Sequence, residues 1–254
     1  MLSMLVIRPN EWVPEERLAN FGWGPRGATR AALHCAVSRL RRCLARYSDR
    51  NWIEHSDAGY RISVPPERVD TAVFRQTVED AAKAGGGVVR LQRLGTALRV
   101  WRGRPLTHTS DWVRCDPEVL ALERDRLQCG YDLADLGLSC GRAQTALPLI
   151  ERLAVELPYD EPLQARRLLL MNAVGRRAEA LRLYDRIRRQ LADELGVDPS
   201  GTLRTTHLAL LGDGSDEMVG ESARVLQTYR REQVRRRRQR RSVVKHALSR
   251  PLPR

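Results

Sequence analysis

The chain has 254 residues, of which 42% are hydrophobic and 5% aromatic, so leucine, alanine and valine supply most of its core. This composition favours helices over a β-sandwich. Lysine and arginine number 44 against 31 acids, a net charge of +13, and no apolar stretch is long enough to cross a membrane. These features exclude a membrane-spanning protein.

The positive charge gathers at the two ends of the chain. Residues 1–64 hold ten basic and six acidic residues, residues 65–220 hold twenty-two and twenty-three, and residues 221–254 hold twelve and two. Basic ends beside a neutral middle indicate a polyanionic partner, nucleic acid before membrane. The five cysteines form no C-x-x-C pair and the first residues lack a secretory pattern, so we expect a cytoplasmic protein with reduced thiols.

Two short helices are predicted at the start of the chain. Residues 1–7 are apolar and indicate the end of a helix with no capping residue before it, and Pro9 marks a turn. "VPEE" at 13–16 predicts a helix start, because proline suits the first turn and acids suit the positive end of the helix dipole. Gly22 and Gly24 are expected to end this second helix.

The next predicted helix, about residues 29–47, has an apolar side and a basic side. Leu33, Val37, Leu40 and Leu44 recur at helical spacing and predict one face packed on a core. Charge runs on helices are often only solvated surfaces, so the residues alone leave that reading open. The remaining surface carries polar and basic residues, namely His34, Ser38, Arg39, Arg41, Arg42 and Arg46.

After this helix the pattern changes to strand-like alternation. Residues 52–55 and 60–64 are predicted strands, and the segment 56–59, SDAG, has turn chemistry, which predicts a β-hairpin. Pro65-Pro66 predicts a domain boundary, so residues 1–64 are expected to form one domain. Helix, turn, helix and hairpin follow in the order of a winged helix-turn-helix, whose second helix enters the major groove of DNA. Arginine suits that helix because it forms two hydrogen bonds to guanine and its permanent charge binds phosphate.

From residue 69 to about 211 the pattern is helical throughout. "GRAQTALPLIERL" at 141–153 aligns with "GRRAEALRLYDRI" at 175–187, an offset of 34 residues that matches the tetratricopeptide period. Small residues at matching positions, Ala146 and Ala180, allow paired helices to approach closely. A neutral stack of helix pairs is a binding surface, so residues 66–212 are expected to form an all-α interaction domain. The predicted fold is mainly α with a partial winged helix-turn-helix.

Residues 213–254 form a basic tail. "RRRRQRR" at 235–241 places six arginines in seven residues, and no apolar period continues past the helical domain. We expect disorder, or a helix that forms only on a partner, with some salt-dependent affinity for DNA.

No pattern in the sequence indicates a metal, a cofactor or a catalytic site. The histidines are scattered, and none forms H-x-x-x-H or pairs with cysteine at ligand spacing, so no metal site is expected. "AGGGVVR" at 84–90 lacks the lysine of a phosphate-binding loop. The acids of "PYDEP" at 158–162 are interpreted as charges at a helix start. An enzyme is therefore disfavoured.

Several segments resemble the Streptomyces antibiotic regulatory proteins, over about residues 1–212. The similarity is carried by "LHCAVSRLRRCL", "AGYRISV", "ALRVWRGRPL", "LPYDEPL" and "GRRAEALRLYDRIRRQLADELGVDPSGTLRTTHLALL". The resemblance implies a transcriptional activator that joins a response-regulator-type winged helix to a bacterial transcriptional activation domain of tetratricopeptide-like helices. It also implies binding to direct repeats as a dimer or side-by-side pair, recruitment of RNA polymerase holoenzyme, and a secondary-metabolite gene cluster as target.

The resemblance also assigns contacts with double-stranded DNA by position. Cys35 and Arg39 stand where such winged helices contact bases, and Arg41 and Arg42 stand at backbone or base-edge positions. Tyr60 matches the residue that anchors the hairpin. The full predicted DNA-binding set is His34, Cys35, Ser38, Arg39, Arg41, Arg42, Arg46, His55, Ser56 and Tyr60.

Two departures from the family pattern bear on function. Ser56-Asp57 stands where the family often has an arginine, and aspartate repels phosphate, so His55 is the nearest substitute for a wing contact. The family also begins with β-strands that would precede Met1 and support the recognition helix, so we expect either an upstream start or an incomplete winged helix. The alternative function is a tetratricopeptide-type scaffold that has lost DNA binding.

Overall fold

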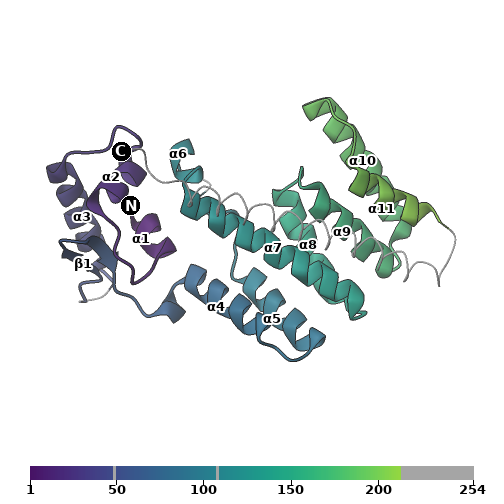
Figure 1. The fold of residues 1–254 in the computed structure, drawn as a ribbon, viewed down its shortest axis with the longest axis horizontal. Helices are drawn as coiled ribbons and strands as arrows, with labels where there is room; N and C mark the ends of the chain where they lie inside the picture. The colour runs from purple at the N-terminus through teal and green to yellow at the C-terminus, as the bar shows by residue number, and fades with distance from the viewer. Residues whose placement is uncertain (48–49, 107–108, 213–254) are drawn as a thin grey trace, which may run out of the picture. The chain divides into compact units, whose positions relative to one another are not determined.

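The computed structural model describes residues 1–47, 50–106 and 109–212, which are mostly helical with one small sheet (Figure 1). The predicted mainly α fold is confirmed, and the tail of residues 213–254 lies outside the described residues. In the described part the elements are α1 (Leu2–Ile7), α2 (Glu15–Trp23), α3 (Arg30–Leu44), β1 (Ile53–Ser56), β2 (Gly59–Ile62), η1 (Pro66–Arg68), α4 (Asp70–Ala82), α5 (Gly87–Arg99), α6 (Asp111–Arg114), α7 (Pro117–Ser139), α8 (Ala143–Glu156), α9 (Glu161–Ala173), α10 (Arg177–Leu195) and α11 (Gly201–Leu211).

The chain divides into two compact units, the first Met1–Asp132 and the second beginning at Leu133. In the first unit α4 packs on both η1 and α1, and side chains of α4 bind the end of α1. Thr71 donates a hydrogen bond to the Val6 carbonyl (3.0 Å), and Arg75 donates one to the Ile7 carbonyl (2.8 Å). The predicted domain boundary at residues 65–66 remains a prediction.

Helix α3 begins and packs as its sequence predicts. The Thr29 hydroxyl accepts a hydrogen bond from the Ala32 amide (3.2 Å), which satisfies one unpaired donor of the first turn. Leu33 and Val37 are 2% and 1% exposed. Leu40, further along the stripe, is half-buried. The apolar stripe therefore seats α3 on the core of the first unit and leaves its opposite face outward.

The predicted hairpin is present, with Ile53 paired to Ile62 and Ser56 to Gly59 in an antiparallel register. A third segment extends it, because the Val13 and Tyr60 backbones exchange two hydrogen bonds of 2.8 and 2.9 Å. Gly59 has φ +113°, and a Cβ there would lie 2.1 Å from the Val13 carbonyl oxygen. Glycine is required at this position, since both the dihedral angle and the close backbone exclude a side chain.

In the second unit, α8 and α10 are the two copies of the predicted repeat. Gly141 and Gly175 precede them with φ of +63° and +81°, and Ala146 and Ala180 are fully buried at matching positions. A Cβ on Gly137 of α7 would lie 2.7 Å from the Ala146 Cβ, so small residues set this helix contact. The predicted tetratricopeptide-like packing is confirmed.

Helix α9 is central to the second unit, packing on α8, α10 and α11. Its N-cap is Asp160, whose carboxylate accepts a hydrogen bond from the Leu163 amide (2.9 Å), and the Glu161 carboxylate accepts one from the Ser200 amide (2.6 Å). Asp160 thus caps α9, and Glu161 connects the start of α9 to the residue that caps α11. Among the residues described, no helix combines the length and apolarity that a membrane crossing requires.

Candidate nucleic-acid interface

The outward face of α3 is basic and exposed. The helix contains four arginines and no acidic residue. Successive residues of a helix turn by about 100°, so residues three, four, seven or eight apart share a side. The residues exposed on the outward face and just after its end are Cys35, Ser38, Arg39, Arg42 and Arg46. Within the described part of the chain, these three arginines form no salt bridge.

Arg41 lies on the flank of α3 that faces the hairpin. Its guanidinium donates two hydrogen bonds to the Ile53 carbonyl oxygen, at 3.1 Å from Nε and 2.8 Å from Nη2. The sequence could have indicated that Arg41 faces the protein, because it follows Leu33 and Val37 of the apolar stripe by eight and four residues, which places it on their side of the helix. The DNA contact at Arg41 stays a prediction. Two of the five N–H donors of its guanidinium bind the Ile53 carbonyl and hold strand β1 against α3.

Tyr60 of β2 is 3% exposed. Its ring stacks on His55 with centroids 4.4 Å apart, and its backbone pairs with Val13. Burial, with a contribution from the nearby Glu15 carboxylate, raises the pKa of the Tyr60 hydroxyl. The stacking and the backbone pairing hold Tyr60 beside His55 and Val13, and its side chain is largely covered. The hairpin anchor and the DNA contact that the resemblance assigns to Tyr60 stay predictions.

The last two residues of β1, His55 and Ser56, are exposed. The Ser56 hydroxyl accepts a hydrogen bond from the Ala58 amide (3.2 Å), which closes the turn. Along the strands, Arg61 donates two hydrogen bonds to the Glu54 carboxylate (2.8 and 2.6 Å), and this bonding lowers the pKa of Glu54. The positive charge of the hairpin is therefore neutralised locally, whereas the charge on the outward face of α3 is not.

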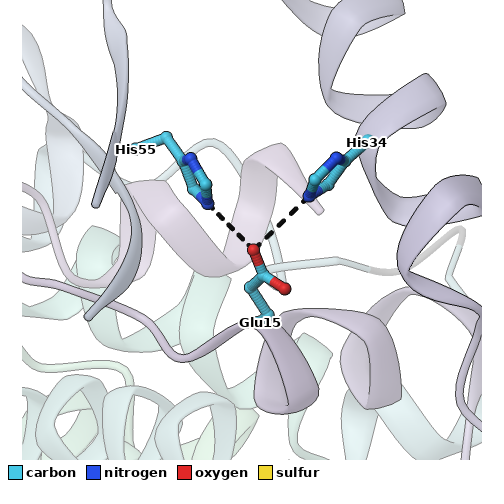
Figure 2. Close-up of side chains that lie close together, drawn as sticks. All are labelled: Glu15, His34 and His55. Carbon is cyan, nitrogen blue, oxygen red and sulfur yellow. Dashed lines mark hydrogen bonds and ion pairs between the residues drawn. The ribbon is translucent and has the colours of Figure 1, made fainter. Parts of the chain in front are cut away.

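Glu15 of α2 contacts side chains of both α3 and the hairpin (Figure 2). Its Oε1 lies 2.8 Å from His55 Nε2 and 3.5 Å from His34 Nε2, and its Oε2 lies 3.1 Å from Arg30 Nε. The hydrogen bond from His55, followed by that from His34, lowers the pKa of the Glu15 carboxyl. Sequence reasoning missed Glu15 and Arg30 because the three elements that carry these groups meet only in the folded chain.

Residues 69–211 match the family described as the bacterial transcriptional activator domain. That match covers more than half of the chain and gives its class, the proteins that carry a bacterial transcriptional activator domain. The chain belongs to the Streptomyces antibiotic regulatory protein family of transcriptional activators, as its sequence motifs predicted.

Two named relatives show the extent of this similarity. The chain is 35% identical to the transcriptional regulatory protein EmbR of Mycobacterium tuberculosis over 219 residues, 83% of this chain and 56% of EmbR. It is 27% identical to the regulatory protein DnrI of Streptomyces peucetius over 223 residues, 83% of this chain and 82% of DnrI.

A solved structure agrees with these sequence matches. Mycobacterium tuberculosis EmbR in complex with a low-affinity phosphopeptide aligns with a TM-score of 0.63 and 29% identity, covering 90% of this chain and 63% of that one. The chain thus spans a little over half the length of EmbR.

Proposed function

We propose that this chain binds double-stranded DNA sequence-specifically and activates transcription. The observation that carries the proposal is the exposed, acid-free face of α3, held outward by the burial of Leu33 and Val37. In a winged helix such a face lies in the major groove, with bases read by forked donors and phosphates bound by charge. Family membership supports the same role.

The residues of this interface are proposed to have different roles, depending on whether their side chains are exposed to DNA or already contact the protein. Arg39 and Arg42 are proposed to bind bases and phosphates, and Arg46 to bind phosphate beyond the helix end. Arg41 and Tyr60 are proposed to position the hairpin, because their polar or aromatic groups already contact the protein. The smaller or turn residues His34, Cys35, Ser38, His55 and Ser56 are proposed to contribute short-range groove contacts.

The helical region 66–212 is proposed to form the activation domain, which contacts RNA polymerase holoenzyme or a second copy of the chain. Its stacked helix pairs offer the type of surface that repeat proteins use for partners. By family resemblance, the target is proposed to be a secondary-metabolite gene cluster and the site of action the cytoplasm, where chromosomal DNA is available.

A gel-shift series on promoter fragments from the gene's own neighbourhood tests the DNA-binding role. The wild-type chain should retard a specific fragment at about 150 mM salt, where purely non-specific phosphate binding weakens sharply. Arg39→Ala or Arg42→Ala should cost about 1–3 kcal/mol, or about 5- to 150-fold in Kd. Arg182→Ala, which removes an exposed arginine in α10, is the control and should leave Kd unchanged.

The salt dependence of Kd distinguishes an arginine that binds DNA phosphate from one that only positions the hairpin. Arg42→Ala should reduce the slope of log K against log salt by about one if it removes a phosphate contact. Arg41→Met should leave that slope unchanged while lowering the stability of the hairpin. Equal slopes for all variants would refute the assigned roles, and failure of the wild-type chain to retard any fragment specifically would favour the alternative interaction scaffold.

A further inference from the structure

We propose that Glu15, His34 and His55 form a binding site for a divalent transition metal of the zinc class. One carboxylate oxygen and two imidazole nitrogens, all within 4.8 Å of one another, converge from α2, α3 and β1 (Figure 2). Two histidines and one glutamate are a ligand set that zinc uses in proteins. This inference goes beyond DNA binding and does not depend on it, and with metal bound His34 and His55 act as ligands in place of the groove contacts proposed above.

The distances suit a metal at the centre of the three groups. Zinc bonds of about 2.0–2.2 Å in a tetrahedron separate neighbouring ligand atoms by about 3.3 Å. Glu15 Oε1 lies 2.8 Å from His55 Nε2 and 3.5 Å from His34 Nε2, on either side of that value. The two imidazole nitrogens lie within the 4.8 Å limit of the cluster, so modest side-chain rotations bring them to bonding distance.

Neighbouring groups hold the ligands in this arrangement. The His55 ring stacks on Tyr60 at 4.4 Å, and the His34 ring meets His55 edge-on at 5.7 Å. Arg30 Nε lies 3.1 Å from Glu15 Oε2, which orients the carboxylate and directs Oε1 toward the histidines. Hydrogen bonds to ligands and packing around them have this orienting role in metal sites.

The composition of the site also selects among metals. Imidazole favours zinc, copper, nickel and cobalt, whereas magnesium and calcium require several oxygen ligands. The side chains of Glu15, His34 and His55 are 25%, 46% and 36% exposed, so the site opens to solvent and leaves a coordination position for water. A bound metal would link the recognition helix to the hairpin and to α2, and would stabilise their relative arrangement within the first unit.

Metal titration of the untagged full-length chain, first stripped with a chelator, tests the proposal. Isothermal titration with Zn²⁺ should show one equivalent bound at this site, and Co²⁺ should give the visible absorption of a four-coordinate nitrogen and oxygen site. The midpoint of thermal unfolding should rise with Zn²⁺ concentration, because a ligand that binds the folded chain stabilises it. Mg²⁺ should produce neither effect.

Variants identify the ligands. His55→Gln and Glu15→Gln should each abolish the Co²⁺ spectrum, whereas His207→Gln, which removes a histidine stacked on Tyr184 in the second unit, should retain it. Circular dichroism in chelator must show that the cluster variants are folded, and His34→Gln provides a further single substitution if one of them is not. An unchanged spectrum in folded cluster variants, a thiolate-to-cobalt band that indicates cysteine ligation, or absence of binding to the wild-type chain would overturn the proposal.

Discussion

Gly59→Ala tests how the hairpin is held against the backbone of Val13 and Pro14. The new Cβ would lie 2.1 Å from the Val13 carbonyl oxygen and 2.8 Å from the Pro14 Cα, and neither atom belongs to a flexible side chain. The backbone must therefore move, and the two hydrogen bonds between Val13 and Tyr60, of 2.8 and 2.9 Å, are the contacts that separate. The residue must also leave or strain its φ of +113°.

The magnitude follows from these two effects. Two backbone hydrogen bonds contribute about 0.5–1.5 kcal/mol each, and an alanine held at strongly positive φ costs about 1–3 kcal/mol. The expected loss in the free energy of unfolding is therefore about 2–6 kcal/mol, a large share of the roughly 5–15 kcal/mol that stabilises a typical domain.

Urea denaturation followed by circular dichroism measures this loss, with two glycine controls. Gly141 has φ +63° but open space where a Cβ would lie, so Gly141→Ala carries strain without a clash. Gly85 has neither constraint, and Gly85→Ala should change stability by no more than about 0.5 kcal/mol. If Gly59→Ala lowers the free energy of unfolding by less than about 1 kcal/mol, or by no more than Gly141→Ala does, the close approach of the Val13 backbone does not determine the stability of the hairpin.

Three further predictions concern buried or paired groups. Asp135→Ala should lower the free energy of unfolding by about 3 kcal/mol, because it removes the carboxylate bonded at 2.7 and 3.1 Å to Arg166, which is 1% exposed. Burial raises the pKa of the Cys129 thiol to about 12 from 9.0, so a thiol reagent should label Cys35 in the native chain and Cys129 only after unfolding. The pKa of Glu15 is lowered, so its contribution to stability should be present above its ordinary value of 4.5 and be lost on further acidification, a pH dependence that Glu15→Gln should remove.

Matched measurements can contradict the first two of these predictions. Asp132→Ala breaks a half-exposed pair with Arg90 and should cost under about 1 kcal/mol, so equal losses at residues 132 and 135 would remove the case for a buried pair. Native labelling of Cys129 at the rate of an exposed thiol would contradict its burial. The Cys129 shift also predicts that stability falls as the pH rises from about 9 toward 12, because only the unfolded chain then releases the proton.

Much of the fold was predictable because it depends on local patterns. The stripe through Leu33 and Val37 predicts α3 by its helical period, and glycine and aspartate between alternating residues predict the hairpin. The repeat around Ala146 and Ala180 predicts helix pairs because the same spacing recurs 34 residues on. Each of these signals lies within one element or repeats along the chain.

The tertiary structure decided which of the basic and polar residues remain exposed. Arg41 and Arg42 are adjacent in the sequence, yet one binds the Ile53 carbonyl and the other is exposed. Glu15 meets His34 and His55 across 19 and 40 residues of chain, a distance over which sequence spacing carries no geometric information. Residues close together in the sequence set the helical or strand period of one element, so the sequence predicts that element. Only the packing of α2, α3 and β1 against one core brings the side chains of Glu15, His34 and His55 together.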